Sequence, residues 1–188
     1  KFKMNFTKDK NNFAPYARDE NTLARKWAIP GTKGLEHRIG GLEKDDGSGN
    51  VSYDPDNHYK MTIKRQEKVD KISNFIPNID VHGKKSGNLL VVGWGGTFGS
   101  IRSAVSQAQE NGLSVSHIHL KYINPFPKNL GDILVKFDKI LIPELNMGQL
   151  LSIIRAKYLV DARGYNRIKG KPFTSSEILK EIQTYLKD

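Results

Sequence analysis

The chain has 188 residues, 30 of them lysine or arginine and 20 aspartate or glutamate, and no cysteine. Its length suits one ordinary domain plus a substantial appendage, and the lack of cysteine excludes disulfides, a thiol nucleophile and cysteine-bound zinc or iron–sulfur sites within it. The net charge of +10 is spread out, with 17 basic and 12 acidic residues in positions 1–87 and 13 and 8 in positions 88–188. A solvated surface therefore explains the charge better than a nucleic-acid interface.

No apolar run approaches the roughly 20 residues that a bilayer-spanning helix needs, and no signal-peptide pattern opens the chain. We expect a cytoplasmic protein that binds neither a membrane nor nucleic acid. Residues 1–5 do not resemble a natural start, so we also expect a piece of a longer polypeptide, or a processed terminus.

Residues 1–80 predict an irregular arm, because glycine and proline interrupt any sustained hydrophobic period. Positions 1–56 contain too few apolar residues for a core of their own, so we expect them to pack on the second half or on an absent partner. Positions 57–75 predict a charged helix with a thin apolar edge that includes Met61 and Ile72. Positions 76–87, with Pro77, Gly83 and Gly87, indicate a linker.

From position 88 onward, apolar strands alternate with amphipathic helices. The predicted strands are 89–92, 115–120, 139–145 (broken by Pro143) and part of 159–169. The helices between them are marked by Phe98–Ala108 after an N-cap at Thr97, Leu130–Phe137, Met147–Tyr158, and Ile178–Leu186 after a capping box at Thr174–Glu177. The alternation predicts an α/β fold over residues 81–188, with a mostly parallel sheet and helices on both faces.

The loop Gly93–Gly99 joins the first strand to the first helix, where α/β sheets bind ligands. Its spacing misses the dinucleotide fingerprint, because Phe98 stands where the third glycine belongs, and no acid follows the second strand to hold a ribose. A structural strand-to-helix turn is therefore favoured over nucleotide binding.

Glu144 and Asn146 follow the third strand at the same edge, where a carboxylate can act as a base or ligand. Capping of the next helix is the favoured interpretation, since a helix N-terminus attracts negative charge. His117 and His119 share one strand face and could bind a metal, but no third ligand is evident, so partly buried or interface histidines are favoured. His37 and His58 lie in the arm near carboxylates, and there a site and loop-stabilising hydrogen bonds remain equal alternatives.

Several stretches taken in order resemble the alpha subunit of the 2-oxoacid:ferredoxin oxidoreductases, most closely the 2-oxoglutarate type. They are Pro15-Tyr16, Pro30-Gly31, Gly34–His37, Asp54-Pro55 with His58, Met61, Arg65 and Lys68, then Gly93–Thr97, Asn124–Pro127, Pro143–Leu150 and Gly170–Thr174. The resemblance covers nearly the whole chain from about residue 13, and the order and spacing of the stretches are more specific than any single motif.

The resemblance implies oxidative decarboxylation of a 2-oxoacid to an acyl-CoA, with ferredoxin taking the electrons. Thiamine diphosphate, magnesium and an iron–sulfur cluster would serve the assembled enzyme, with none bound by this chain alone. The implied partners are a beta subunit, ferredoxin and CoA, in an oligomer. Residues 1–80 would end a pyrimidine-binding domain, and residues 81–188 would form a transketolase C-terminal-like domain.

Such a domain is a scaffold at subunit interfaces and can border the entry for substrate or CoA. No residue of the chain is assigned a catalytic or metal-binding role. The candidates for the substrate, CoA or interface side are Glu36, His37, His58, Arg65, Gly95, Gly96, Thr97, Glu144 and Asn146. The rival hypotheses are a nucleotide- or nucleic-acid-binding α/β module and a pure interaction module.

Overall fold

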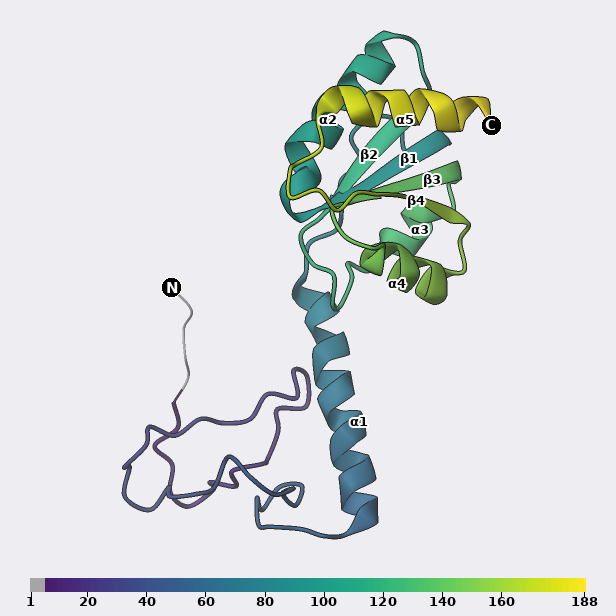
Figure 1. The fold of residues 1–188 in the computed structure, drawn as a ribbon. Coiled ribbons are helices and arrows are strands. Elements are labelled where there is room, and N and C mark those ends of the chain that lie inside the picture. The colour runs from purple at the N-terminus through teal and green to yellow at the C-terminus, as the bar shows by residue number, and fades with distance from the viewer. Residues whose placement is uncertain (1–5) are drawn as a thin grey trace. The chain divides into compact units, whose positions relative to one another are not determined.

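The computed structural model describes residues 6–188, and the five residues from which a longer polypeptide was inferred lie outside this range. The chain divides into two units, residues 1–75 and 76–188, which are described separately (Figure 1). We call the described part of the first, residues 6–75, the arm unit, and the second the α/β unit. Over the described residues, no helix combines the length and apolar character needed to cross a membrane.

The α/β unit is built on four parallel strands, as its fold class predicts. In spatial order they are β2 (Val115–Leu120), β1 (Gly87–Trp94), β3 (Phe137–Glu144) and β4 (Ala162–Asn166). The register sets Trp94 of β1 beside Leu120 of β2, and Glu144 of β3 beside Asn166 of β4. The carboxyl ends of the strands therefore meet along one edge, which is where a site is expected.

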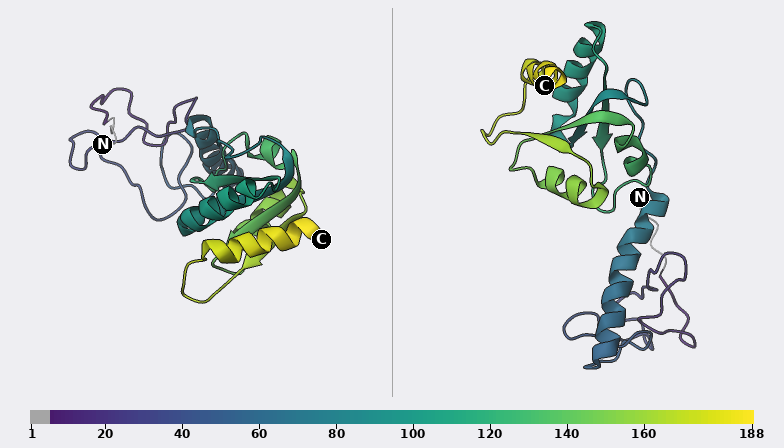
Figure 2. Two further views of the ribbon diagram at one scale, coloured as in Figure 1. Left: turned by 90° about the horizontal axis from the view of Figure 1, so that it is seen from above. Right: turned by 90° about the vertical axis from the view of Figure 1, so that its right-hand side faces the viewer.

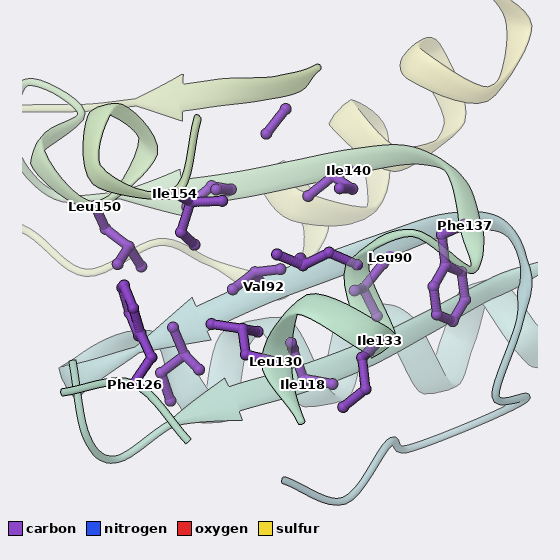
Figure 3. Packing of buried hydrophobic residues seen from close by; sticks show 14 residues of the cluster. Leu90, Val92, Ile118, Phe126, Leu130, Ile133, Phe137, Ile140, Leu150 and Ile154 are labelled. Carbon is purple, nitrogen blue, oxygen red and sulfur yellow. The ribbon is translucent and has the colours of Figure 1, made fainter. Parts of the chain in front are cut away.

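Helices cover both faces of this sheet. Helices α2 (Phe98–Glu110) and α5 (Ser175–Lys187) pack on one face, and α3 (Leu130–Leu134) and α4 (Gln149–Tyr158) lie on the other (Figures 1 and 2). Side chains alternate along each strand, so Leu89 and Val91 face α2 and α5. Leu90 and Val92 contribute to the opposite core layer with residues from α3 and α4 (Figure 3).

Three details of the predicted helices and strands are wrong. Phe137 opens β3 instead of closing a helix, because α3 ends at Leu134. Met147 is not on a buried helical face: it precedes α4 and is 82% exposed. Pro143 does not break β3. The ladder with β1 ends at Leu141, so the missing N–H of the proline removes no hydrogen bond to β1.

Residues 76–87 were expected as a linker, but 76–86 belong to the α/β unit and contact the rest of it, and Gly87 opens β1. The Asn129 amide accepts from Ile79 N–H and donates to Ile79 C=O, both at 3.0 Å. His82 and His117 exchange backbone hydrogen bonds of 2.9 Å, which pairs this segment with the edge strand β2. The glycine and proline residues of this segment predicted a linker. Its contacts were not predictable, because their partners lie about 35 to 50 residues away in the sequence.

The arm unit contains one long helix, α1 (Pro55–Lys71), followed by the 3-10 turn Ile72–Phe75. Asp54 caps α1 by accepting from Asp56 N–H at 3.0 Å. The rest is irregular, with isolated bridges such as the one between Arg18 and Arg25. Its buried side chains are Tyr16, Leu35, Met61, Lys44 and Asn57.

Candidate functional site

The strand order reverses between β1 and β3, and such a switch point is where α/β sheets open a crevice for ligands. Here two side chains close it. The indole N–H of Trp94, at the end of β1, donates to Glu144 Oε1 at 3.2 Å from the end of β3. A hydrogen bond within the chain itself thus spans the switch point.

Glu144 is fully buried, and both of its oxygens are engaged. Oε1 accepts from Leu150 N–H at 3.0 Å, and Oε2 accepts from Leu151 N–H at 3.0 Å. The Asn146 amide adds a bond of 3.2 Å to Oε1, and its own carbonyl oxygen accepts from Gly148 N–H at 2.7 Å. These are the bonds that the capping interpretation predicts, so Glu144 and Asn146 anchor the start of α4.

Glycines at the end of β1 and in the turn after it allow helix α2 to pack closely on the strand. A Cβ on Gly93 would come within 2.7 Å of Ile101 Cδ1, so a larger residue here would require the end of the Ile101 side chain on α2 to move. Gly95 has φ +56°, which also favours glycine. Thr97 occupies the N-cap position but makes no capping bond there. Its hydroxyl instead donates to Trp94 C=O at 2.8 Å and accepts from Trp94 N–H at 3.2 Å.

A cleft lies beside the end of β2, with a volume of about 740 Å³. We call it the β2-end cleft. The functional groups that line it are two imidazoles, two further aromatic rings, two cations and one carboxylate, which belongs to the segment before β1. Those side chains are His117, His119, Phe98, Tyr122, Arg102, Lys121 and Asp80.

The pKa values of the two histidines of this cleft are both lowered. His117 is 1% exposed, and neither ring nitrogen has a hydrogen-bond partner among residues 6–188. Burial, helped by the charge of Arg102, lowers the pKa of His117 to about 3. Burial also lowers the pKa of His119, whose ring meets Phe98 edge-on at 5.0 Å between centroids.

A neutral imidazole offers one donor and one acceptor, so the β2-end cleft can hydrogen-bond a polar ligand against its aromatic walls. The metal alternative gains no support, because no group of three possible ligand side chains converges within the described residues. His117 is buried and His119 is partly buried, which agrees with the favoured interpretation of partly buried or interface histidines. Arg102 was not identified from the sequence, although its spacing of four from Phe98 places both residues on one helix face.

The arm candidates form two separate groups. Glu36 accepts from Gly34 N–H at 2.8 Å, and His37 Nδ1 lies 2.8 Å from Leu35 C=O, so both serve their own loop. His58 and Arg65 meet on the Glu43 carboxylate, at 2.8 Å and 3.0 Å.

Glu43 was missed by sequence reasoning, since it lies 15 and 22 residues from its partners in an irregular segment. The hydrogen bonds from Arg65 and His58 lower the pKa of Glu43 to about 2. At the sheet edge the structure brings together Thr97, Glu144 and Asn146 through Trp94, while Gly95 and Gly96 form the adjoining turn. The sheet-edge and arm candidates belong to different units.

Comparison with known proteins gives consistent matches. Residues 87–178 match the family described as pyruvate:ferredoxin oxidoreductase core domain II. The chain is 48% identical over 185 residues to the 2-oxoglutarate oxidoreductase subunit KorA of Mycobacterium tuberculosis, covering 98% of this chain and 28% of that protein. It is 30% identical over 119 residues to the 2-oxoglutarate synthase subunit KorA of Methanocaldococcus jannaschii, covering 63% of this chain and 31% of the relative.

A solved structure also matches. It is the 2-oxoglutarate:ferredoxin oxidoreductase from Magnetococcus marinus with 2-oxoglutarate, coenzyme A and succinyl-CoA bound, with a TM-score of 0.88 and 27% identity. The match covers 97% of this chain and 32% of the other. The chain thus spans less than a third of the length of these three relatives.

Proposed function

Because this chain belongs to the 2-oxoacid:ferredoxin oxidoreductases, we propose that it is a C-terminal portion of their alpha subunit and that the whole protein is a 2-oxoglutarate:ferredoxin oxidoreductase. It converts 2-oxoglutarate and CoA to succinyl-CoA and CO₂, and passes the two electrons to oxidised ferredoxin. The observation that carries this proposal is the 48% identity to a 2-oxoglutarate oxidoreductase subunit along 98% of the chain.

Within that enzyme, these residues act as a scaffold and interface. At the sheet edge the buried Glu144 is committed to α4 and to Trp94, which supports a structural role for the switch point. In the arm unit, Tyr53, Tyr59 and Phe75 are 83%, 70% and 70% exposed, which supports contact with further protein surface. We assign residues 1–80 to the end of a pyrimidine-binding domain and residues 81–188 to a transketolase C-terminal-like domain.

The assembled enzyme would use thiamine diphosphate with magnesium, and an iron–sulfur cluster, to cleave the 2-oxoacid and carry its electrons. The donor set of this chain does not fit the cluster, because the sequence contains no cysteine. The residues described also include no cluster of three metal-binding side chains. The further partners that we propose are a beta subunit, ferredoxin and CoA, in a cytoplasmic oligomer.

The test is to purify the full-length alpha subunit with its beta subunit and to measure reduction of ferredoxin or of a viologen dye. We expect reduction that requires both 2-oxoglutarate and CoA, with succinyl-CoA as product. Pyruvate in place of 2-oxoglutarate is the matched control for the substrate. Absence of CoA-dependent reduction with every 2-oxoacid tried would contradict the assignment.

A further inference from the structure

The arm unit contains a cavity of about 620 Å³ in which cationic side chains outnumber carboxylates. We call it the arm pocket. A volume of this size lies in the range of small-molecule sites. Five cations and one carboxylate line it: Arg18, Arg25, Lys44, Arg65, Lys68 and Glu43.

The nearby carboxylates are already engaged. Glu43 accepts from Arg65 at 3.0 Å and lies 2.8 Å from His58 Nδ1. Asp46 pairs with Lys60 at 2.9 Å and also with Lys64. Among residues 6–188, no carboxylate forms an ion pair with any of the other four lining cations, Arg18, Arg25, Lys44 and Lys68.

Two of these cations, Arg18 and Arg25, are held in position by neutral groups. Arg18 Nη1 donates to Leu23 C=O at 3.1 Å, and Arg25 Nη1 donates to Pro15 C=O at 3.3 Å. The Arg25 guanidinium also stacks over the Tyr16 ring at 4.4 Å from its centroid. Arg18 Nε is buried and has no hydrogen-bond partner in the part of the chain that the structure describes.

The cations repel one another. Burial and then the charge of Arg25 lower the pKa of Arg18, against a smaller opposing effect of Asp46. Burial and then the charges of Arg18 and Arg25 lower the pKa of Lys68. Lys44 adds a fourth charge nearby, 3% exposed and bonded to the carbonyl groups of Gly40 and Leu42. Half-buried like charges held together in this way destabilise a fold unless an anion joins them.

We propose that the arm pocket binds a small-molecule polyanion of the diphosphate class. A single carboxylate would neutralise one of the free cations and leave the others in repulsion. Free pyrophosphate and nucleoside diphosphates carry about three negative charges near pH 7, and the diphosphate diester of coenzyme A carries about two. Each offers oxygens to both guanidinium groups, which bind phosphate in two-pronged geometry. Nucleoside diphosphates, the diphosphate of coenzyme A and free pyrophosphate share this chemistry.

Inorganic pyrophosphate is the direct probe, titrated calorimetrically into the assembled full-length protein at physiological salt. We expect saturable binding to one site per alpha subunit, weakened roughly tenfold or more by Arg18→Gln and by Lys68→Gln. Lys33→Gln is the matched control, since Lys33 is exposed, carries the same charge and does not line the arm pocket. Its affinity should equal that of the unsubstituted protein.

Competition then identifies the source of the diphosphate. Displacement of pyrophosphate by coenzyme A but not by ADP assigns the pocket to coenzyme A, and the reverse assigns it to a nucleotide. Displacement by neither leaves free pyrophosphate as the ligand. Equal displacement by glutarate, no saturable binding, or equal weakening by Lys33→Gln would each overturn the proposal. These readouts do not depend on turnover, so they separate the pocket from the proposed reaction.

Discussion

In the α/β unit, each strand of the sheet contributes to two core layers, with Leu89 and Val91 in one and Leu90 and Val92 in the other. In the arm unit, the buried apolar residues are Tyr16, Leu35 and Met61. The arm unit depends more on hydrogen bonds from side chains to backbone and on ion pairs around α1. Periodic burial thus stabilises one unit, whereas polar contacts position charges in the other.

This difference has a functional meaning. A core built by periodic burial leaves few charges without partners, and in the α/β unit even the buried Glu144 is satisfied. The arm unit instead holds Arg18, Arg25 and Lys68 around a cavity. Repulsion between unpaired cations in a unit with a small apolar core is typical of a binding site in which the ligand supplies the missing negative charge.

The largest effect is expected from matched core truncations. Leu141→Ala in β3 should lower the free energy of unfolding of the α/β unit by about 4 kcal/mol, because Leu141 is fully buried in a closed layer. Met61→Ala should cost only about 2 kcal/mol, since Met61 lines the arm pocket and water can enter the space left. Hydrogen exchange measured in each unit separates the two effects. Equal loss of protection in both units would contradict the comparison.

Glu144→Ala tests the polar contact that closes the switch point. It leaves the N–H groups of Leu150 and Leu151 and the Trp94 indole without their acceptor, so we expect a loss on the order of 3 kcal/mol. The matched control is Thr174→Ala, which removes the exposed cap of α5 and should cost about 1 kcal/mol. Amide exchange at the start of α4 and of α5 measures both. A cost of Glu144→Ala no larger than that of Thr174→Ala would refute the anchoring role.

The two units also differ in how much their sequences predict. The strand at 115–120 and the capping box at Thr174–Glu177 were predicted correctly, because apolar runs and caps are local signals. Phe137 was misplaced because a five-residue helix and the following strand place apolar residues at similar spacings. The capping role of Glu144 was predictable from its place before a helix, but the donation from Trp94, 50 residues away, was not.

The arm unit offered weaker signals. Arg65 and His58 were singled out, but their shared partner Glu43 lies in a segment with no period. The arm pocket joins Arg18 and Arg25 to Lys68 on a helix more than 40 positions later, and no spacing rule links such positions. Charges brought together by an irregular chain become visible only in three dimensions.

Acid should weaken the α/β unit through the buried His117. Its pKa is about 3 in the fold and 6.5 as the reference value, so between these values the unfolded chain binds a proton that the fold does not. Stability is therefore full above about pH 6.5 and falls as pH decreases toward 3, by about 2 kcal/mol between pH 7 and pH 5. Urea unfolding at the two pH values measures this. His117→Leu should remove most of the difference, and an unchanged difference would exclude His117 as its source.

The smallest effect is expected at Glu43. Glu43→Gln removes the acceptor shared by Arg65 and His58, but these partners are largely exposed, so the cost should be about 0.5 kcal/mol at pH 7. The pKa of Glu43 is lowered from 4.5 to about 2, so its contribution is present above pH 4.5 and is lost as pH falls toward 2. Thermal unfolding of the protein and the variant should accordingly converge near pH 2.

Glu43→Gln also distinguishes stability from binding in the arm unit. It removes the one carboxylate that lines the arm pocket and so should tighten pyrophosphate binding while slightly destabilising the unit. Lys68→Gln should do the opposite, weakening binding while relieving the repulsion with Arg18 and Arg25. Calorimetry measures the affinity of each variant for pyrophosphate, and hydrogen exchange measures the stability of its arm unit. Together they test the predicted direction of both changes in both variants. If both variants change affinity in the same direction, net charge is not what the arm pocket contributes.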